Sequence, residues 1–160
     1  MSDSEGPVVV QRGLWYEELE VGTTYRHSPG RTISEADNTL FSAMTMNQQA
    51  LHVDEVFATK QEFRGRLVNS MLTLSIVVGL SVNQLTQGTL VANLGFDQVR
   101  FPAPVRHGDT LRGETVVVAK RESKSRLAQG IVTMQHIGYN QHDEVVVDAT
   151  RNVLMQMAPQ

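Results

Sequence analysis

The 160-residue sequence contains no cysteine, no long apolar run and no excess of basic charge. Without cysteine, disulfides and thiolate catalysis are excluded, and the commonest zinc ligands are missing. The longest apolar stretch, residues 71–82, contains serine, threonine and glycine and is too short to cross a bilayer. The net charge of -3 provides no basic field for nucleic acid. We therefore expect a cytoplasmic protein with no metal ion, no membrane contact and no nucleic-acid partner.

The composition predicts one globular domain. Hydrophobic residues make up 41% of the chain and charged residues 19%, which is ordinary for a folded protein. The length suits one core rather than two. We expect residues 1–12 to be a flexible lead-in and residues 13–157 to form the domain.

The order of the predicted elements indicates an α+β fold. Ser34 is a candidate N-cap for a helix that ends near Thr45, with apolar positions at Ala36, Leu40, Phe41 and Met44. A second helix, Val68 to Leu85, is apolar almost all round and must be buried on most sides, and Gly88 ends it. The segments with strand patterns are 23–26, 31–33, 89–94, 97–101, 110–120, 128–140 and 144–157. The basic run at 120–126 is expected in a solvated hairpin.

A polar loop that precedes the long helix is the main candidate for chemistry. It reads T-M-N-Q-Q-A-L-H-V-D from Thr45 to Asp54 and contains His52. The following helix directs unpaired backbone N–H groups towards this loop. A histidine beside such donors can position a water against a carbonyl and stabilise the developing oxyanion.

This region resembles the MaoC-type (R)-specific enoyl-CoA hydratases and dehydratases. Their loop reads roughly T-G-D-x-N-P-[ILV]-H-x-D and is followed by H-G-M at the start of a central helix. Thr45, His52 and Asp54 match that pattern. The departures are Asn47 for the family's aspartate, Gln49 for its asparagine, Ala50 for its proline, and Asn69, Ser70 and Met71 for H-G-M. The segment 99–111, V-R-F-P-A-P-V-R-H-G-D-T-L, also resembles a family turn.

The resemblance implies a single hotdog domain, in which an antiparallel sheet wraps around the long helix. It also implies a homodimer or higher homo-oligomer and an acyl-CoA substrate, with coenzyme A as part of that substrate and no separate cofactor. In the family, an aspartate and a histidine share the acid and base work. A backbone N–H at the start of the central helix polarises the thioester carbonyl, and here Ser70 stands at that place.

The replacement of the aspartate leaves several hypotheses open, because the amide of Asn47 can orient water but cannot accept its proton. In the first hypothesis, His52 alone is the base, while Asn47 and Gln49 hold water and substrate. In the second, Asp54 or Glu55 supplies a carboxylate from further along the loop. Capping a short helix is the simpler role for Asp54. Alternatively, the protein binds acyl-CoA without converting it, or hydrolyses a thioester.

The whole block T-M-N-Q-Q-A-L-H-x-D with R-L-V-N-S resembles most closely the branch that handles mesaconyl-CoA and itaconyl-CoA. Those acyl groups carry a free carboxylate, which an aspartate would repel. Neutral amides at Asn47, Gln49 and Asn69 could instead donate hydrogen bonds to it. The resemblance thus predicts reversible addition of water to a short, carboxylated 2-enoyl-CoA.

Overall fold

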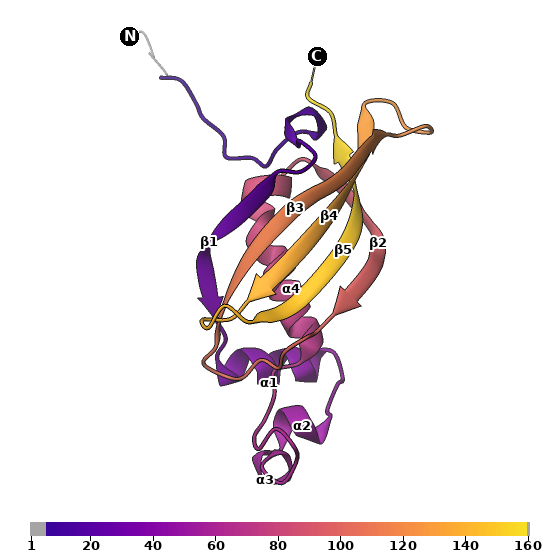
Figure 1. Cartoon of the computed structure of the whole chain (residues 1–160). Helices are drawn as coiled ribbons and strands as arrows, with labels where there is room; N and C mark the ends of the chain where they lie inside the picture. The colour runs from indigo at the N-terminus through magenta and orange to yellow at the C-terminus, as the bar shows by residue number, and fades with distance from the viewer. Residues whose placement is uncertain (1–5, 160) are drawn as a thin grey trace.

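A single antiparallel sheet curved around one helix forms the body of the protein in the computed structural model, which describes residues 6–159 (Figure 1). The strand order is β1-β3-β4-β5-β2, and every neighbouring pair is antiparallel. The strands are β1 (Thr24–Thr32), β2 (Leu90–Arg100), β3 (Thr110–Glu122), β4 (Gln129–Tyr139) and β5 (Val145–Gln156). This arrangement confirms the predicted α+β class with one sheet around a central helix.

The central helix is α4 (Ser70–Ser81), and a π-helical turn at Val82–Thr86 continues it. The sequence placed its start near Val68, but α4 begins two residues later because Asn69 caps it through its side chain. Gly88 follows with φ +74°, the left-handed conformation that glycine adopts most easily. The prediction that Gly88 ends this helical segment is therefore confirmed.

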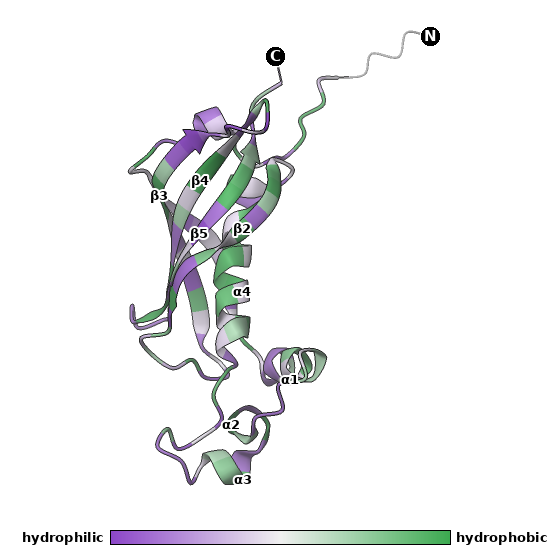
Figure 2. Ribbon diagram, turned by 90° about the vertical axis from the view of Figure 1, so that its right-hand side faces the viewer, coloured by the Kyte–Doolittle hydropathy of each residue, from purple (hydrophilic) through white to green (hydrophobic). Residues whose placement is uncertain are grey.

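One face of α4 packs very closely on the inner face of the sheet. Val77 is 1% exposed and lies against Gly138 of β4. A Cβ added at Gly138 would come within 2.5 Å of the Val77 side chain, so a larger residue would push the helix off the sheet. Figure 2 shows apolar residues along α4 and along the strands that it covers.

Three shorter helices lie beyond one end of the sheet, below it in Figure 1. They are α1 (Glu35–Met44), α2 (Ala50–Val53) and α3 (Glu55–Ala58). Ser34 caps α1 and forms a reciprocal capping box with Asp37, as the sequence predicted for the cap. The polar loop around His52 is thus folded into α2 and its flanks, next to the start of α4.

The apolar positions of α1 do not form its buried face. Phe41 packs against the core, but Leu40 and Met44 are 63% and 75% exposed. The residues that α1 buries completely are Asn38 and Ser42, one helical turn apart. The helix therefore turns a polar stripe inwards, where it meets the backbone of the site described below.

Some strand boundaries also differ from the expectations. Residues 23–26 and 31–33 join into the single strand β1 across a bulge between His27 and Arg31, and β2 likewise unites 89–94 with 97–101 through bulges. Bulges interrupt the alternation that the sequence pattern relies on. The basic run lies at the β3–β4 hairpin, as predicted. Of the predicted lead-in, residues 1–5 lie outside the described part, and 6–12 form neither helix nor strand.

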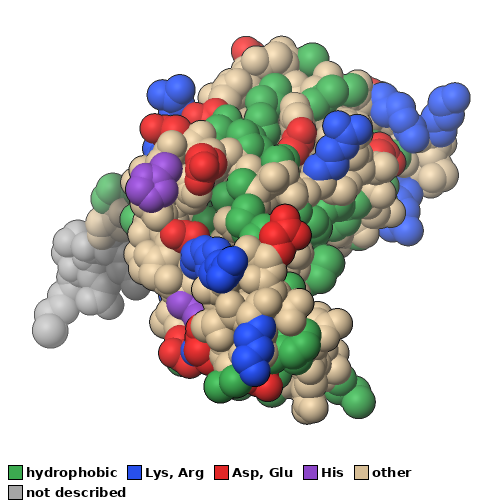
Figure 3. Space-filling view, turned by 60° about the horizontal axis from the view of Figure 1, so that its bottom comes forward, with side chains coloured by type: hydrophobic (Ala, Val, Ile, Leu, Met, Phe, Trp, Pro, Cys, Tyr) green, Lys and Arg blue, Asp and Glu red, His purple; other side chains and the backbone are tan. Residues whose placement is uncertain are grey.

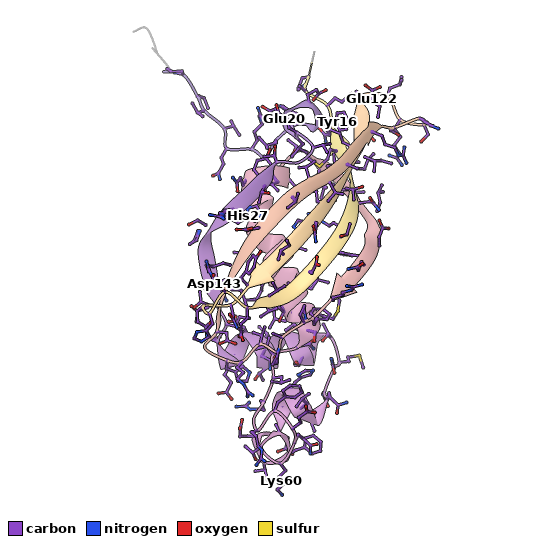
Figure 4. The ribbon with its side chains drawn as sticks, viewed as in Figure 1. Tyr16, Glu20, His27, Lys60, Glu122 and Asp143 are labelled. Atoms are coloured by element: carbon purple, nitrogen blue, oxygen red, sulfur yellow. The ribbon has the colours of Figure 1, made fainter. Side chains whose placement is uncertain are left out.

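A chain of buried polar side chains crosses the inner face of the sheet beneath α4. Arg151 donates through Nε to Nε2 of His136 (2.8 Å), and Nδ1 of His136 lies 2.8 Å from the hydroxyl of Thr115. That hydroxyl lies 2.7 Å from Nε2 of His27, whose Nδ1 contacts Gln84 (2.8 Å). Because arginine can only donate, Nε2 of His136 must accept, so His136 is neutral and donates through Nδ1 to the Thr115 hydroxyl. Burial lowers the pKa of His27, which favours its neutral form as well. Figure 4 shows His27 on the β1 side of the sheet.

This polar chain separates two apolar clusters of the core. The cluster at the α1 end of the sheet includes Leu111, Val147 and Ala149, and the cluster at the other end includes Val117, Met134 and Val153. Thr115, His136 and Arg151 occupy the inward positions between them on β3, β4 and β5. Breaking these hydrogen bonds would destabilise the core, since unpaired buried polar groups destabilise a fold. Within residues 6–159, Nη2 of Arg151 is buried and already lacks a partner.

We predict that the free energy of unfolding decreases as the pH falls below about 6.5, the ordinary histidine pKa. Burial, with Arg151 and His27 nearby, lowers the pKa of His136 to about 3. Between these two values the unfolded chain binds a proton that the folded chain does not. Stability is therefore fully developed above pH 6.5 and is lost towards pH 3, by up to about 1.4 kcal/mol per pH unit. Urea unfolding at a series of pH values measures this dependence.

His136→Gln is the matched control for that prediction, because glutamine can accept from Arg151 and donate to Thr115 without titrating. Its stability should depend less steeply on pH than that of the wild type. An equally steep dependence in both proteins would show that His136 does not cause the effect.

Candidate active site

His52 lies in α2, and its ring is oriented by a backbone carbonyl. Its Nδ1 is 2.9 Å from the carbonyl oxygen of Leu67, and a carbonyl can only accept, so Nδ1 carries the proton. The other ring nitrogen, Nε2, then has a free lone pair. His52 as a whole is half-buried. The Nδ1–H form is the tautomer that a general base needs.

The first turn of α4 begins three residues after the carbonyl that holds His52. Asn69 is 2% exposed and accepts a hydrogen bond from the backbone N–H of Met71 (3.0 Å). Among the described residues, no hydrogen bond engages the backbone N–H of Ser70, the first residue of the helix. A free N–H at a helix N-terminus favours a developing negative charge.

A cavity of about 250 Å³ opens at this end of α4. Its wall is mainly apolar, with Ser70 and Thr73 as the polar members on the helix. The remaining lining residues come from the loop before α4, the segment after β2 and the start of β5, namely Phe63, Leu67, Val68, Phe101, Pro102, Ala103, Pro104, Val105 and Val146. An apolar cavity with a few polar groups is the usual form of a small-molecule site.

The two amides of the polar loop lie on the surface near α2. Gln49 caps α2, with its side-chain oxygen 3.1 Å from the backbone nitrogen of Ala50. Asn47 is exposed and its side-chain oxygen is 3.4 Å from the backbone nitrogen of Gln49. Of the predicted site residues, Ser70 lines the cavity, whereas His52, Asn69, Asn47 and Gln49 do not. The His52 ring is joined to the cavity wall through the carbonyl of Leu67, and Asn47 and Gln49 bond to the backbone of their own loop.

The carboxylates of the loop are engaged in structural contacts. Asp54 caps α3 through a 2.9 Å hydrogen bond from the backbone N–H of Phe57, the capping role weighed from the sequence. Glu55 pairs with Arg66 at 2.7 Å. Arg66 also pairs with Glu35 of α1 at 2.6 Å, which ties α1, α3 and the loop before α4 together. Met71, a predicted substrate contact, is 53% exposed on α4.

Asn38 is part of this site, and the sequence analysis missed it. It lies in α1, is fully buried, and contacts the backbone of both the His52 segment and the Asn69 segment. The apolar positions of α1 gave no indication that Asn38 would be buried. Two polar residues at helical spacing, Asn38 and Ser42, were the signal that could have found it.

No metal site and no membrane-spanning helix are found within residues 6–159. No group of three or more histidine or acidic side chains is placed to hold a metal ion in this range. None of the described helices is both long enough and apolar enough to cross a membrane.

The fold and the site define a class: a hotdog domain with a histidine beside the N-terminus of its central helix. The family model described as the MaoC like domain matches residues 17–140. The chain belongs to this family. A solved MaoC-like dehydratase from Rhodospirillum rubrum has a TM-score of 0.81 and 31% identity, covering 92% of this chain and 100% of that one. The predicted hotdog fold and family resemblance are confirmed.

Two curated relatives are similar over most of this chain. Beta-methylmalyl-CoA dehydratase of Chloroflexus aurantiacus is 33% identical, and mesaconyl-CoA hydratase of Cereibacter sphaeroides is 31% identical, each over 90% of this chain. The match covers 40% and 41% of those proteins, respectively. The chain therefore spans about two fifths of the length of these relatives.

Proposed function

We propose that this protein adds water reversibly across the 2,3 double bond of a short acyl-CoA, with His52 as the general base. The observation that carries this proposal is the hydrogen bond from His52 Nδ1 to the Leu67 carbonyl. It leaves Nε2 free to accept a proton, and the carbonyl that holds the ring belongs to Leu67, three residues before Ser70 and its free N–H. The names of the curated relatives, a dehydratase and a hydratase of CoA thioesters, support the same reaction.

The proposed reaction uses three parts of the site. Nε2 of His52 takes a proton from water, and the resulting oxygen nucleophile attacks C3 of the enoyl thioester. The negative charge that develops on the thioester oxygen is stabilised by the backbone N–H of Ser70. His52 then returns its proton to C2, so the same side chain acts first as base and then as acid. Asn47 and Gln49 would orient the water and the acyl group.

A carboxylated acyl group, such as mesaconyl or itaconyl, is the proposed substrate. The similarity to mesaconyl-CoA hydratase supports it. So does the chemistry of the loop, in which Asp54 and Glu55 are engaged elsewhere and the remaining polar side chains are neutral. A neutral amide can donate to a carboxylate that an aspartate would repel.

We propose further that a second copy of this chain completes the site. Strand β2 is an edge strand, and Leu94 and Phe96 on it are 50% and 37% exposed. Leu40, Met44 and Met71 of the adjoining helices are also more than half exposed. Figure 3 shows apolar side chains between charges of both signs at the end of the molecule that carries α1 to α3. Surfaces of this kind pair in homodimers.

A non-catalytic acyl-CoA binder is the rival function, because the family's aspartate is replaced by Asn47. Thioester hydrolysis is the other alternative. Loss of enoyl absorbance at constant thioester content distinguishes hydration from both alternatives.

The first prediction for this reaction is that His52→Gln lowers kcat by about a hundredfold or more, the usual scale for a lost general base. Glutamine preserves a donor to the Leu67 carbonyl but cannot carry a proton between water and C2. The assay follows crotonyl-, mesaconyl- and itaconyl-CoA separately. Asp54→Asn is the matched control, since asparagine caps α3 as well as aspartate does. An equal loss in Asp54→Asn would show that Asp54 also takes part in the proton transfer, so that His52 does not act alone.

The second prediction is that Ser70→Pro lowers kcat by about 10²- to 10³-fold while the protein stays folded. Proline is favoured at the first position of a helix, and Asn69 has φ -58° and ψ 126°, a conformation that a following proline permits. The substitution therefore removes little besides the N–H. Ser70→Ala retains that N–H and should stay within a few-fold of the wild type. Full activity in a folded Ser70→Pro variant would place the oxyanion site elsewhere.

The third prediction concerns the substrate. Asn47→Asp should weaken turnover of mesaconyl- and itaconyl-CoA, because the new charge repels the acyl carboxylate, and should spare or improve turnover of crotonyl-CoA. The ratio of kcat/KM values across the three substrates is the measurement. Acceleration of all three alike would contradict the charge argument.

A further inference from the structure

A buried asparagine connects the segments that surround His52. Asn38 of α1 is 0% exposed. Its Nδ2 lies 3.3 Å from the carbonyl oxygen of His52, 3.2 Å from that of Leu67 and 3.0 Å from Nε2 of His107. Its Oδ1 accepts from the backbone N–H of Asn69 at 2.8 Å. One side chain thus contacts α2, Leu67 before α4, the N-cap residue Asn69, and the turn between β2 and β3.

These partners fix the orientation of the Asn38 amide. The backbone N–H of Asn69 can only donate, so the atom facing it must be the oxygen. The carbonyls of His52 and Leu67 can only accept, so the nitrogen must face them. The same nitrogen faces Nε2 of His107, which must therefore accept, and the two amide hydrogens serve these three acceptors, so one hydrogen is shared. His107 is then neutral, with its proton on Nδ1.

The Leu67 carbonyl receives hydrogen bonds from two of these groups. It accepts from His52 Nδ1 at 2.9 Å and from the Asn38 amide. A carbonyl oxygen has two lone pairs, so both bonds can form together. Asn38 therefore holds the group that orients the His52 ring and, through Asn69, the first turn of α4.

We propose that Asn38 is a positioning residue that keeps the His52 ring in its Nδ1–H tautomer and at a fixed place relative to the start of α4, and that it does so only while His107 is neutral. Its role in turnover rests on the proposed hydration. Its effect on the His52 ring does not, because the hydrogen bonds exist without substrate.

The surroundings of His107 favour the neutral form. Burial is the main reason that the pKa of His107 is lowered, and the nearby Arg66 lowers it further. Glu35 and Glu55 act in the opposite direction, but both are paired with Arg66. A proton on Nε2 of His107 would face the Asn38 amide N–H, donor against donor. Acidification should therefore break this contact and release the amide from its position.

The test is an imidazole NMR experiment on the substrate-free protein, using nitrogen–proton correlations that report the tautomer of each ring. In the wild type at pH 8, His52 should be a single Nδ1–H tautomer. In Asn38→Ala it should become a mixture of tautomers, because the Leu67 carbonyl is no longer held. A folded Asn38→Ala protein whose His52 tautomer is unchanged would overturn the proposal.

Two further variants keep the test decisive if Asn38→Ala does not fold. His107→Gln can accept from Asn38 at every pH, so it should preserve the His52 tautomer and remove the acid-induced change that the wild type shows. Asn38→Asp has the same shape as the native residue but places a negative charge against His107. It should raise the pKa of His107 above its wild-type value and lose the single His52 tautomer. No change in either ring in Asn38→Asp would also overturn the proposal.

Turnover provides a separate measurement with the same variants. Asn38→Ala should lower kcat about ten- to a hundredfold with little change in KM, since a mispositioned base slows the chemical step. His107→Gln should retain activity at pH 8 and lose it less steeply than the wild type on acidification.

If the wild type hydrates no enoyl-CoA, the proposed function fails, while the NMR result still decides whether Asn38 positions His52. Normal kcat in Asn38→Ala, with an active wild type, would contradict the positioning role.

Discussion

The close contact between α4 and the sheet is the constraint on which the rest of the structure depends. Val77 sits against Gly138, where there is no room for a Cβ, so the helix has one depth and one register on the strands. That register fixes where the first turn of α4 lies relative to the strands, and there Asn69 caps the helix and the N–H of Ser70 has no intrahelical partner. The apolar cavity and the carbonyl of Leu67 then fall beside that end of α4. The packing of α4 on the sheet thus positions one part of the site, and the loop before α4 supplies the other part, the histidine.

The fold was predictable because its main signals are local or periodic. The apolar segment of α4, the Ser34 cap, Gly88 and the long strands of the second half each follow from side-chain chemistry along the chain. The bulges in β1 and β2 were not predictable, since they break the alternation that identifies a strand. In the site, His52, Asn69 and Ser70 could be located from the loop and the helix start. Asn38 could not, because its partners lie 14, 29, 31 and 69 residues away.

Helix α1 buries Asn38 and exposes Leu40 and Met44. This explains why the sequence pattern did not reveal Asn38 and why α1 carries an exposed apolar surface. An amphipathic helix normally buries its apolar stripe. Here Asn38 is buried instead, because the backbone groups of the loop and of the α4 cap need hydrogen-bond partners away from water. Leu40 and Met44 are consequently left outside. Water is a poor environment for such a stripe, which is why a second copy of the chain is its proposed partner.

Within the described residues, the carboxylates near His52 are bound in structural contacts, which leaves the polar loop with no free negative charge. Asp54 is used to cap α3, and Glu35 and Glu55 share Arg66, so the negative charges near His52 already have partners that hold the short helices together. In place of a carboxylate, His52 has a backbone carbonyl at Nδ1, which orients the ring without placing a charge beside it. An acyl group with its own carboxylate would meet no fixed negative charge at such a base. In the proposed mechanism His52 alone serves as base and then as acid, so that mechanism requires no carboxylate at position 47 but does require the carbonyl of Leu67 to hold the ring.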